Sequence, residues 1–468
     1  MQDAWQEARA ILRLGGPVIA TQLAQISMNF VDTVMAGQLS ARDLAAVAVG
    51  GSLWMPIMIF NVGILMSVSP VVSQLFGAGR RGEIGWHVRQ ALWLSLGLGV
   101  LCMFVIRQTG ILLTWMQIEP EIIPVAEGYI SAVSWGLPAV CAYAVLRCTT
   151  ESTSLTQPLM WISLLGTLAN ICGNYVLMYG HFGFPRLGAY GCGVATALSE
   201  WLMLAMLTGW MAWYPYYRSM RLFEKFNGPD WREFREILRI GVPIGTSLFM
   251  EGSSFAALAL LMGTLGTTAV AGHQIALNVA SISFMVPLGL SVAISVRVGQ
   301  AIGRGDRFGA RRAGTVGAGL AMAFMALAAV AMLTMPGYIT GLYTSDEEVQ
   351  TMAIGLLSMA ALFQLSDGLQ VAGAGALRGA KDTKVPMFIT LFAYWIVGLP
   401  MGYSLGILAG YGPKALWVGP IVGLTAAGLL LMLRFQRTIL RLPMVEQETT
   451  TPSIPPAESA VRCGTDAG

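Results

Sequence analysis

Twelve long apolar segments dominate this chain of 468 residues. Each is about 20 residues or longer, which is the helix length needed to cross a hydrocarbon core of about 30 Å. Backbone groups in lipid need internal hydrogen-bond partners, so these segments are predicted to be helices. We therefore predict an all-α membrane protein with twelve transmembrane helices, at roughly residues 10–37, 46–75, 88–112, 122–147, 159–180, 190–213, 236–262, 269–300, 312–335, 348–376, 385–408 and 415–436.

The second half of the chain repeats the first. Residues 11–17 and 237–243 share the pattern Ile-Leu-Arg-x-Gly-x-Pro at an offset of 226 residues (243 − 17). The same offset relates Gln74, Gly77 and Gly79 to Gln300, Gly303 and Gly305. A duplicated membrane unit is typical of carriers, because two similar lobes can rock about a site held between them. We expect two pseudo-symmetric six-helix bundles.

Composition and charge define the domains and their orientation. Only 11% of residues are charged, against about 25% in soluble proteins. The predicted units are an N-terminal lobe (1–213), a cytoplasmic linker (214–235), a C-terminal lobe (236–436) and a disordered cytoplasmic tail (437–468), which is rich in Pro, Ser, Thr and Glu. With both termini inside, 24 of the 28 Lys and Arg residues are cytoplasmic, and the exceptions are Arg42, Arg107, Arg186 and Lys414.

Four acidic residues are predicted well inside spans: Asp32, Glu200, Glu251 and Asp367. An ionisable group at the bilayer centre costs at least ~2.5–3.5 kcal/mol, so such residues usually face a cavity and bind protons, ions or a cationic substrate. A purely structural acid is the alternative for each. Glu251 has Gln25 as its repeat counterpart, so the lobes share a frame but carry different polar groups.

Asp32 has candidate partners in two other predicted helices. Asn170 and Asn174 share one helix face by their i,i+4 spacing, and Thr196 lies in the next predicted helix. Together with Asp32 they could hold a proton network or a small cation such as Na⁺. The sequence leaves open whether these helices are adjacent. Glu200, four residues after Thr196, either lines a cavity or is a structural acid.

His273, Gln25 and Phe363 are candidate cavity-lining residues, with a packed neutral imidazole as the alternative for His273. No nucleotide-binding Gly-x-x-x-x-Gly-Lys-Ser/Thr loop and no His-Glu-x-x-His motif is present in the sequence. No His or Lys is placed to activate a serine. We expect no enzymatic activity, no cofactor and no nucleic-acid partner.

Several motifs together resemble the multidrug and toxic compound extrusion (MATE) family, and its bacterial NorM-type branch in particular. The resemblance covers about residues 8–436 and rests on the segments 30–37 (FVDTVMAG), 43–48 (DLAAVA), 70–79 (PVVSQLFGAG), 271–278 (AGHQIALN) and 377–379 (LRG). It implies a bacterial inner-membrane antiporter with an outward-facing cleft. Such a protein exports amphipathic, mostly cationic drugs and toxins as sodium ions or protons enter.

The resemblance also implies roles for individual residues. Asp32 matches the acid of the family's first helix, with Asn170, Asn174 and Thr196 around it. Glu251 and Asp367 match the acids of the second lobe and are expected to bind substrate. Phe363 stands one turn before Asp367, where sodium-binding proposals in relatives use a Tyr, so its apolar ring favours H⁺ over Na⁺ as the coupling ion.

Two alternatives remain at this point. A flippase for lipid-linked precursors would favour rings of Arg and Lys in the cavity, whereas the deep charges predicted here are acidic. An intramembrane protease would need a Ser–His or paired-acid site. We expect the protein to act as a monomer, with membrane lipid and small organic cations as its partners.

Overall fold

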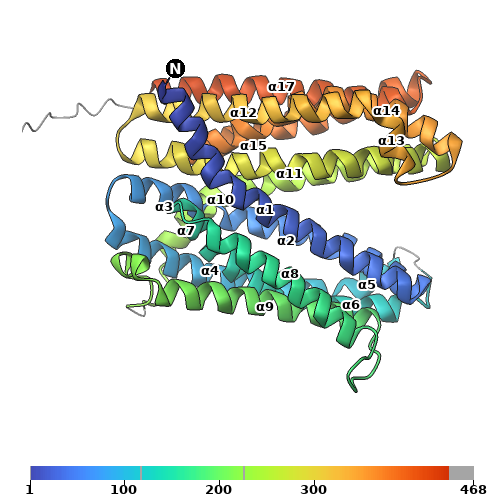
Figure 1. The fold of residues 1–468 in the computed structure, drawn as a ribbon, viewed down its shortest axis with the longest axis horizontal. Helices are drawn as coiled ribbons and strands as arrows, with labels where there is room; N and C mark the ends of the chain where they lie inside the picture. Colours follow the sequence, from blue (N-terminus) through green and yellow to red (C-terminus); the bar gives the residue numbers. More distant parts are fainter. Residues whose placement is uncertain (1, 116–118, 225–226, 442–468) are drawn as a thin grey trace, which may run out of the picture.

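The computed structural model describes residues 2–115, 119–224 and 227–441, and in this part of the chain it contains helices and no β-strand. The helices form two lobes that meet at one end of the molecule and separate at the other (Figure 1). The N-terminal lobe consists of α1 (Gln2–Leu39), α2 (Ala41–Leu65), α3 (Val68–Gly77), α4 (Arg81–Arg107), α5 (Thr109–Trp115), α6 (Ile123–Ser134), α7 (Leu137–Ser152), α8 (Gln157–Leu177) and α9 (Ala189–Trp213).

The C-terminal lobe follows a linker that contains the short 3₁₀ helix η1 (Pro215–Met220). It consists of α10 (Trp231–Gly263), α11 (Thr267–Gly303), α12 (Arg307–Thr334), α13 (Pro336–Gly341), α14 (Glu347–Gly379), α15 (Lys384–Leu391), the π-helical η2 (Phe392–Gly398), α16 (Leu399–Tyr403), the π-helical η3 (Ser404–Leu408) and α17 (Pro413–Leu440). Helix α10 begins five residues before the end of the predicted linker. Most of the predicted tail, residues 442–468, lies outside the described residues.

The membrane-spanning segments follow the predicted order, with internal breaks. Ten are long and apolar enough to cross a membrane, and α6 with α7 forms an eleventh, bent by 42°. We count α1 as the twelfth, although it is more polar, because its 38 residues pack along both lobes. The predicted span at 46–75 is broken at Met66 and Ser67, and the span at 385–408 contains the two π-helical segments.

The bend between α6 and α7 has an identifiable cause. Pro138 is the second residue of α7, and proline lacks the N–H that would continue the hydrogen-bond ladder of α6. The breaks are internal to segments that are apolar throughout, so hydropathy alone did not reveal them.

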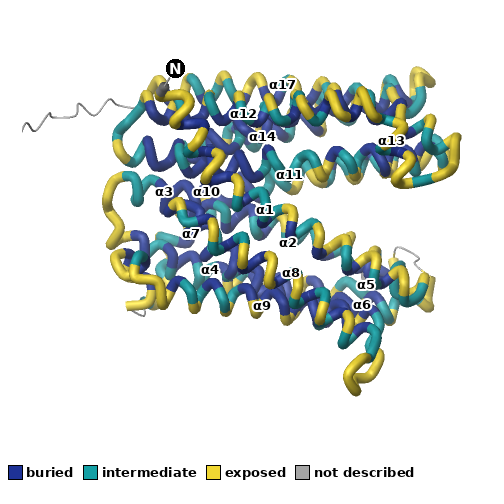
Figure 2. The backbone as a smooth tube through the Cα atoms, viewed as in Figure 1, coloured by how far each residue is buried: buried dark blue, intermediate teal, exposed yellow. Residues whose placement is uncertain are grey.

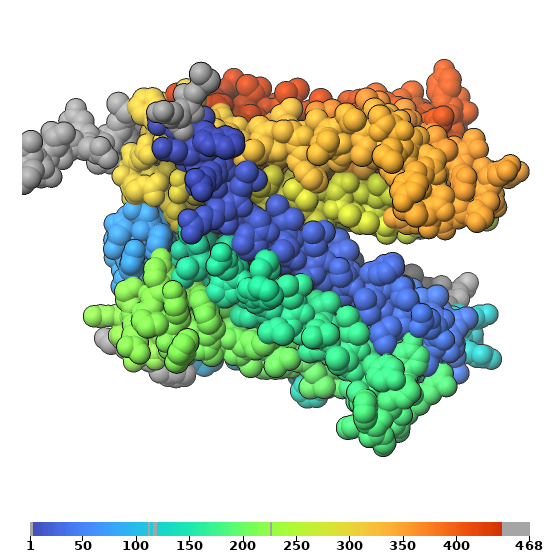
Figure 3. All heavy atoms as spheres, viewed as in Figure 1, coloured from blue at the N-terminus to red at the C-terminus, as the bar shows by residue number. Residues whose placement is uncertain are grey.

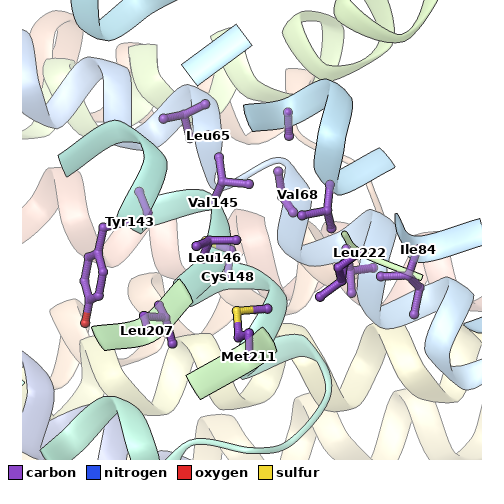
Figure 4. Packing of buried hydrophobic residues seen from close by; sticks show 14 of the residues in the cluster. Leu65, Val68, Ile84, Tyr143, Val145, Leu146, Cys148, Leu207, Met211 and Leu222 are labelled. Carbon is purple, nitrogen blue, oxygen red and sulfur yellow. The ribbon is translucent and has the colours of Figure 1, made fainter. Parts of the chain in front are cut away.

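Buried residues run through the interior of each lobe (Figure 2), and most of them are apolar. Figure 4 shows the largest buried cluster, in which Leu65 and Val68 meet Leu146 and Cys148 of α7 and Leu207 of α9. Helices α2, α4, α8, α9 and α10, which contribute to this cluster, also carry exposed large apolar residues, as expected for helices surrounded by lipid.

Two repeat-related helix crossings join the lobes. In one, α2 crosses α10, and a Cβ added to Gly63 would lie 2.5 Å from the Cα of Gly245. In the other, α1 crosses α11, and a Cβ added to Gly289 would lie 3.0 Å from the backbone nitrogen of Ile19. The offset of 226 relates Gly63 to Gly289 and Ile19 to Gly245. Glycine permits this close backbone approach because it has no side chain.

Hydrogen bonds cross the same junction in matched pairs. The Gln74 side chain of α3 donates to the carbonyl of Gly379 in α14 at 2.9 Å. Its repeat counterpart Gln300, in α11, donates to the carbonyl of Ser152 in α7, also at 2.9 Å. An ion pair between Arg297 and Glu7, with N–O distances of 2.8 and 2.7 Å, adds to this closed end.

At the other end a deep hollow separates the lobes (Figure 3). It lies between α1 of the N-terminal lobe and the helices α11 to α14, and it opens away from the end that carries the N-terminus. The expected cleft between two bundles is therefore present.

Substituting Gly63 tests the crossing directly. We expect Gly63→Ala to cost about 1–3 kcal/mol of stability, because the new methyl group meets the backbone of Gly245. The matched control is Gly51→Ala in the same helix, where an added Cβ meets nothing within 4 Å. The measurement is thermal unfolding in detergent, and equal unfolding temperatures for the two variants would contradict the close crossing.

Candidate functional site

Three helices of the N-terminal lobe bring the predicted Asp32 network together. The Asn174 amide of α8 donates to the Asp32 carboxylate of α1 at 2.6 Å, and the Thr196 hydroxyl of α9 donates to its other oxygen at 3.2 Å. Asn170 lies 3.3 Å from both Asn174 and Thr196. All four side chains are buried. The i,i+4 spacing of the two asparagines therefore does place both amides toward one carboxylate.

One acceptor in this network is unused. The side-chain oxygen of Asn174 is buried without a hydrogen-bond partner. A buried acceptor of this kind can take a proton donated by a protonated Asp32 or coordinate a cation. Within the described residues, no group of three or more His, Cys, Asp or Glu side chains could hold a metal ion. A cation at Asp32 would therefore depend on the neutral oxygens of Asn170, Asn174 and Thr196.

The second-lobe acids Glu251 and Asp367 also lie close together, between α10, α14 and η2. The two carboxyls are near enough for direct charge interaction, and Arg378 is the cation near Glu251. Gln370 and Tyr394 complete the surroundings of Glu251. Asp367 is 3% exposed, whereas Glu251 is partly accessible to solvent. A partly accessible carboxyl deep in a lobe can meet a ligand that enters from the cleft.

Sequence reasoning missed Tyr394. Its ring is 3% exposed, and its hydroxyl lies beside Glu251 and Asp367 but makes no hydrogen bond of normal geometry. No motif marks it, because it belongs to an apolar stretch and its helix position depends on a π-helical turn. Such turns are frequent at functional sites. Tyr394 brings a phenolic oxygen to this pair, so the apolar ring of Phe363 does not by itself distinguish H⁺ from Na⁺.

Phe363 itself is packed among aromatic rings. Its ring centroid lies 5.8 Å from that of Phe255 and 6.0 Å from that of Trp417. With 4% of its surface exposed, Phe363 forms a wall behind the carboxyl pair and does not line an open cavity.

His273 does not line a cavity either. The residue is wholly buried, and its Nδ1 accepts a hydrogen bond from the Trp417 indole at 3.2 Å. The sequence-based expectation of a cavity-lining role is wrong for this structure, and the packed imidazole that was its alternative matches the observed contacts. The reason is that α11 turns this face toward α17.

Glu200 and Gln25 both lie near Arg147, away from Asp32. The Arg147 guanidinium is 3.5 Å from the Gln25 side-chain oxygen and 3.6 Å from Glu151. Glu200 interacts with the same guanidinium through its charge and is 8% exposed. Arg147 lies within α7 and Arg378 at the end of α14, and both are near Glu151.

Two repeated bundles, a hollow between them and one buried polar cluster in each lobe define a membrane carrier. The MatE family model matches residues 17–176 and 243–404, which is once in each lobe. The two matches begin at the prolines that mark the repeat, Pro17 and Pro243. The chain belongs to the MatE family.

Relatives cover nearly the whole chain. The multidrug resistance protein MdtK of Edwardsiella ictaluri is 43% identical over 441 residues, covering 93% of this chain and 96% of that protein. MdtK of Yersinia pseudotuberculosis is 44% identical with the same coverage.

The fold is similar to solved structures as well. The crystal structure of the eukaryotic MATE transporter AtDTX14 aligns with a TM-score of 0.84 at 20% identity and covers 94% of this chain and 98% of that chain. A multidrug resistance MATE family transporter in an outward-facing conformation aligns at 0.85 with 19% identity, covering 93% and 96%.

A double-mutant cycle tests the Asp32 network. Asn174→Ala removes the 2.6 Å bond, and losing a hydrogen bond to a buried group costs about 1–3 kcal/mol. We expect that cost in the wild type and a smaller one in an Asp32→Asn background, with a coupling of at least about 0.5 kcal/mol in the free energy of unfolding. Asn29→Ala, at an exposed position of α1, is the control. Equal costs of Asn174→Ala in both backgrounds would mean that the two side chains do not interact.

Proposed function

We propose that this protein is a secondary antiporter that exports amphipathic, mostly cationic drugs and toxins in exchange for inward H⁺. The observation that carries the proposal is the pair Glu251 and Asp367, two carboxyls that each lie one helical turn from the contacting rings of Phe255 and Phe363 in the second lobe. The chain belongs to the MatE family and is similar to proteins named for multidrug resistance, and both findings support the export of varied compounds.

The carboxyl pair gives a physical basis for cation selectivity. Two neighbouring carboxylates in low-dielectric surroundings repel each other, and the charge of each is costly there without a partner. A lipophilic cation relieves this cost when it enters. When the cation is absent, a proton on either carboxyl relieves the same cost. The cationic cargo and the proton therefore compete for the same pair of carboxyls. The partly buried Phe255 ring, which packs against Phe363, offers apolar and cation–π surface beside the pair.

Asp32 is the coupling site of the first lobe in this proposal. Asn174 and Thr196 both donate to its carboxylate, an arrangement that stabilises the ionised form without a metal ion. When Asp32 is protonated, its carboxyl becomes a hydrogen-bond donor, and rotation of the Asn174 amide lets its free oxygen accept that hydrogen bond. Cargo is released only if the protonated and ionised states of this lobe differ in their affinity for it.

The distribution of charge supports the proposed location and orientation. We place the protein in the bacterial inner membrane as a monomer, with both termini in the cytoplasm and with no cofactor beyond the coupling ion. The basic loops gather at the closed end of the lobes, and the hollow opens at the opposite end. The cleft then faces outward.

The alternatives are not favoured. A flippase for lipid-linked phosphates would favour rings of cations in the cleft, whereas the second-lobe pair is acidic and Arg147 has Glu151 and Glu200 beside it. An intramembrane protease is not favoured, because the chain matches the model of a carrier family once in each lobe.

Removing the carboxyl pair tests the substrate site. We expect the double variant Glu251→Gln/Asp367→Asn to lose efflux of cationic dyes from cells and vesicles while it still folds. The matched control is Glu347→Gln/Glu348→Gln, which removes two exposed carboxyls from the same helix as Asp367. Wild-type efflux by the Glu251/Asp367 variant would refute the assignment.

Vesicles with defined gradients test the coupling ion. Dye transport in sodium-free proteoliposomes should follow an imposed pH gradient, and Asp32→Asn should uncouple it. If transport fails under the pH gradient and a sodium gradient restores it, the ion is Na⁺ and the proton assignment is wrong. Asp32 remains the coupling site in that case if Asp32→Asn also abolishes the sodium-driven transport.

A further inference from the structure

Two cavities occur at repeat-related places on the closed end of the molecule. The first, of about 520 Å³, is an open depression along one face at the start of α1, lined by Trp5, Arg9, Leu12 and Arg13. The second, of about 1060 Å³, lies between the start of α10 and the connection from α14 to α15. With the repeat offset of 226, Arg9, Leu12 and Arg13 correspond to Arg235, Leu238 and Arg239. All three of these counterparts line the second cavity.

The acidic and the basic side chains at the start of α1 lie on two different faces of the helix. Asp3 and Glu7 turn toward the C-terminal lobe and pair with Arg312 and Arg297. Arg9 and Arg13, on the other face, are exposed and form no salt bridge in the described part of the chain. The acids on this helix are thus satisfied internally, and the basic side chains remain available to an external anion.

The same division recurs on α10. Arg235 and Arg239 are exposed, and neither belongs to a salt bridge of the described residues. Each face also begins with a tryptophan one turn earlier. Trp5 is 73% exposed, and its repeat counterpart Trp231 is 81% exposed. Tryptophan with arginine on one helix face is typical of the headgroup region of a membrane.

The second cavity carries further positive charge. Arg232, Lys381 and Lys384 add to its lining, which also contains the acids Glu236 and Asp382. Asp382 is already paired with Arg434 at 2.8 Å. Burial lowers the pKa of Lys381, and the negative charge of Glu236 only partly offsets this decrease. The cavity therefore holds more cationic groups than its own acids can compensate.

We propose that each cavity binds the phosphate headgroup of an anionic phospholipid, through Arg9 with Arg13 in one lobe and Arg235 with Arg239 in the other. Guanidinium groups match phosphate oxygens in a bidentate geometry. Basic pockets between transmembrane helices at the cytoplasmic surface are suited to such headgroups. The tryptophans and the leucine of each face contact the glycerol and upper acyl region.

The two sites are unequal. Pro386 and Pro158 align the second lobe with the first at an offset of 228 in this region, so the counterparts of Lys381 and Lys384 are Thr153 and Thr156. The first lobe therefore lacks both lysines. The site on α10 binds an anionic headgroup more tightly than the site on α1.

Lipid binding to the full chain tests this inference. Native mass spectrometry of the purified protein, titrated with phosphatidylglycerol or with phosphatidylethanolamine, counts bound lipid and yields dissociation constants. We expect two phosphatidylglycerol sites in the wild type. Arg235→Gln/Arg239→Gln should weaken the tighter site about 30-fold, since each interfacial cation contributes about 1 kcal/mol. Arg9→Gln/Arg13→Gln should weaken the other site by a similar factor.

The control removes two exposed arginines from the same end of the molecule but outside both cavities, as Arg218→Gln/Arg304→Gln. It should bind lipid like the wild type. If the control loses as much lipid affinity as the cavity variants, the effect is due to general surface charge and the inference is overturned. Unchanged lipid binding in a variant that combines the Arg→Gln changes at 9, 13, 235 and 239 would overturn it as well. If inorganic phosphate displaces phosphatidylglycerol at equal concentration, the cavities bind free phosphate and the lipid assignment is wrong. Dye efflux by the same variants keeps this outcome separate from the proposed transport function.

Discussion

The close approach of two helix pairs at one end of the molecule determines what the rest of the structure can do. Gly63 meets Gly245 in one crossing, and Gly289 meets Ile19 in its repeat-related counterpart. Because backbones touch there, the lobes are fixed at that end and separate at the other, where the hollow opens. The reciprocal hydrogen bonds of Gln74 and Gln300 hold the same end closed. Two similar lobes joined in this way can rock about the junction without unfolding either bundle.

The polar clusters lie on different sides of this junction, so coupling between them requires motion of a shared element. Helix α1 is such an element, because it packs on α11 near Ile19 and carries Asp32 further along. Thirteen residues separate the two positions, which is roughly 20 Å of helix. Pro17 lies close to the crossing, and the Thr21 hydroxyl bonds to its carbonyl at 3.0 Å. A change of charge at Asp32 can therefore alter how α1 meets the second lobe.

Sequence patterns were informative wherever one helix or the repeat carried the information. Hydropathy predicted the spans, and the offset of 226 predicted two equivalent lobes. The spacing of Asn170 and Asn174 predicted one polar face, although only the packing of α1, α8 and α9 shows that this face meets Asp32. Tyr394 and the burial of His273 could not be predicted, because a π-helical turn and the rotation of a helix against its neighbour leave no mark in hydropathy.

The central claim is that Asp32 controls how the lobes open about the glycine crossings. Spin labels at Phe182 and Leu342, both exposed at the open end, report the separation of the lobes by pulsed electron paramagnetic resonance in liposomes. In the wild type, lowering the pH should shift the distances toward a shorter population as the outer ends close. In an Asp32→Asn variant the distribution should no longer respond to pH. A pH response in that variant equal to the wild type would contradict the account.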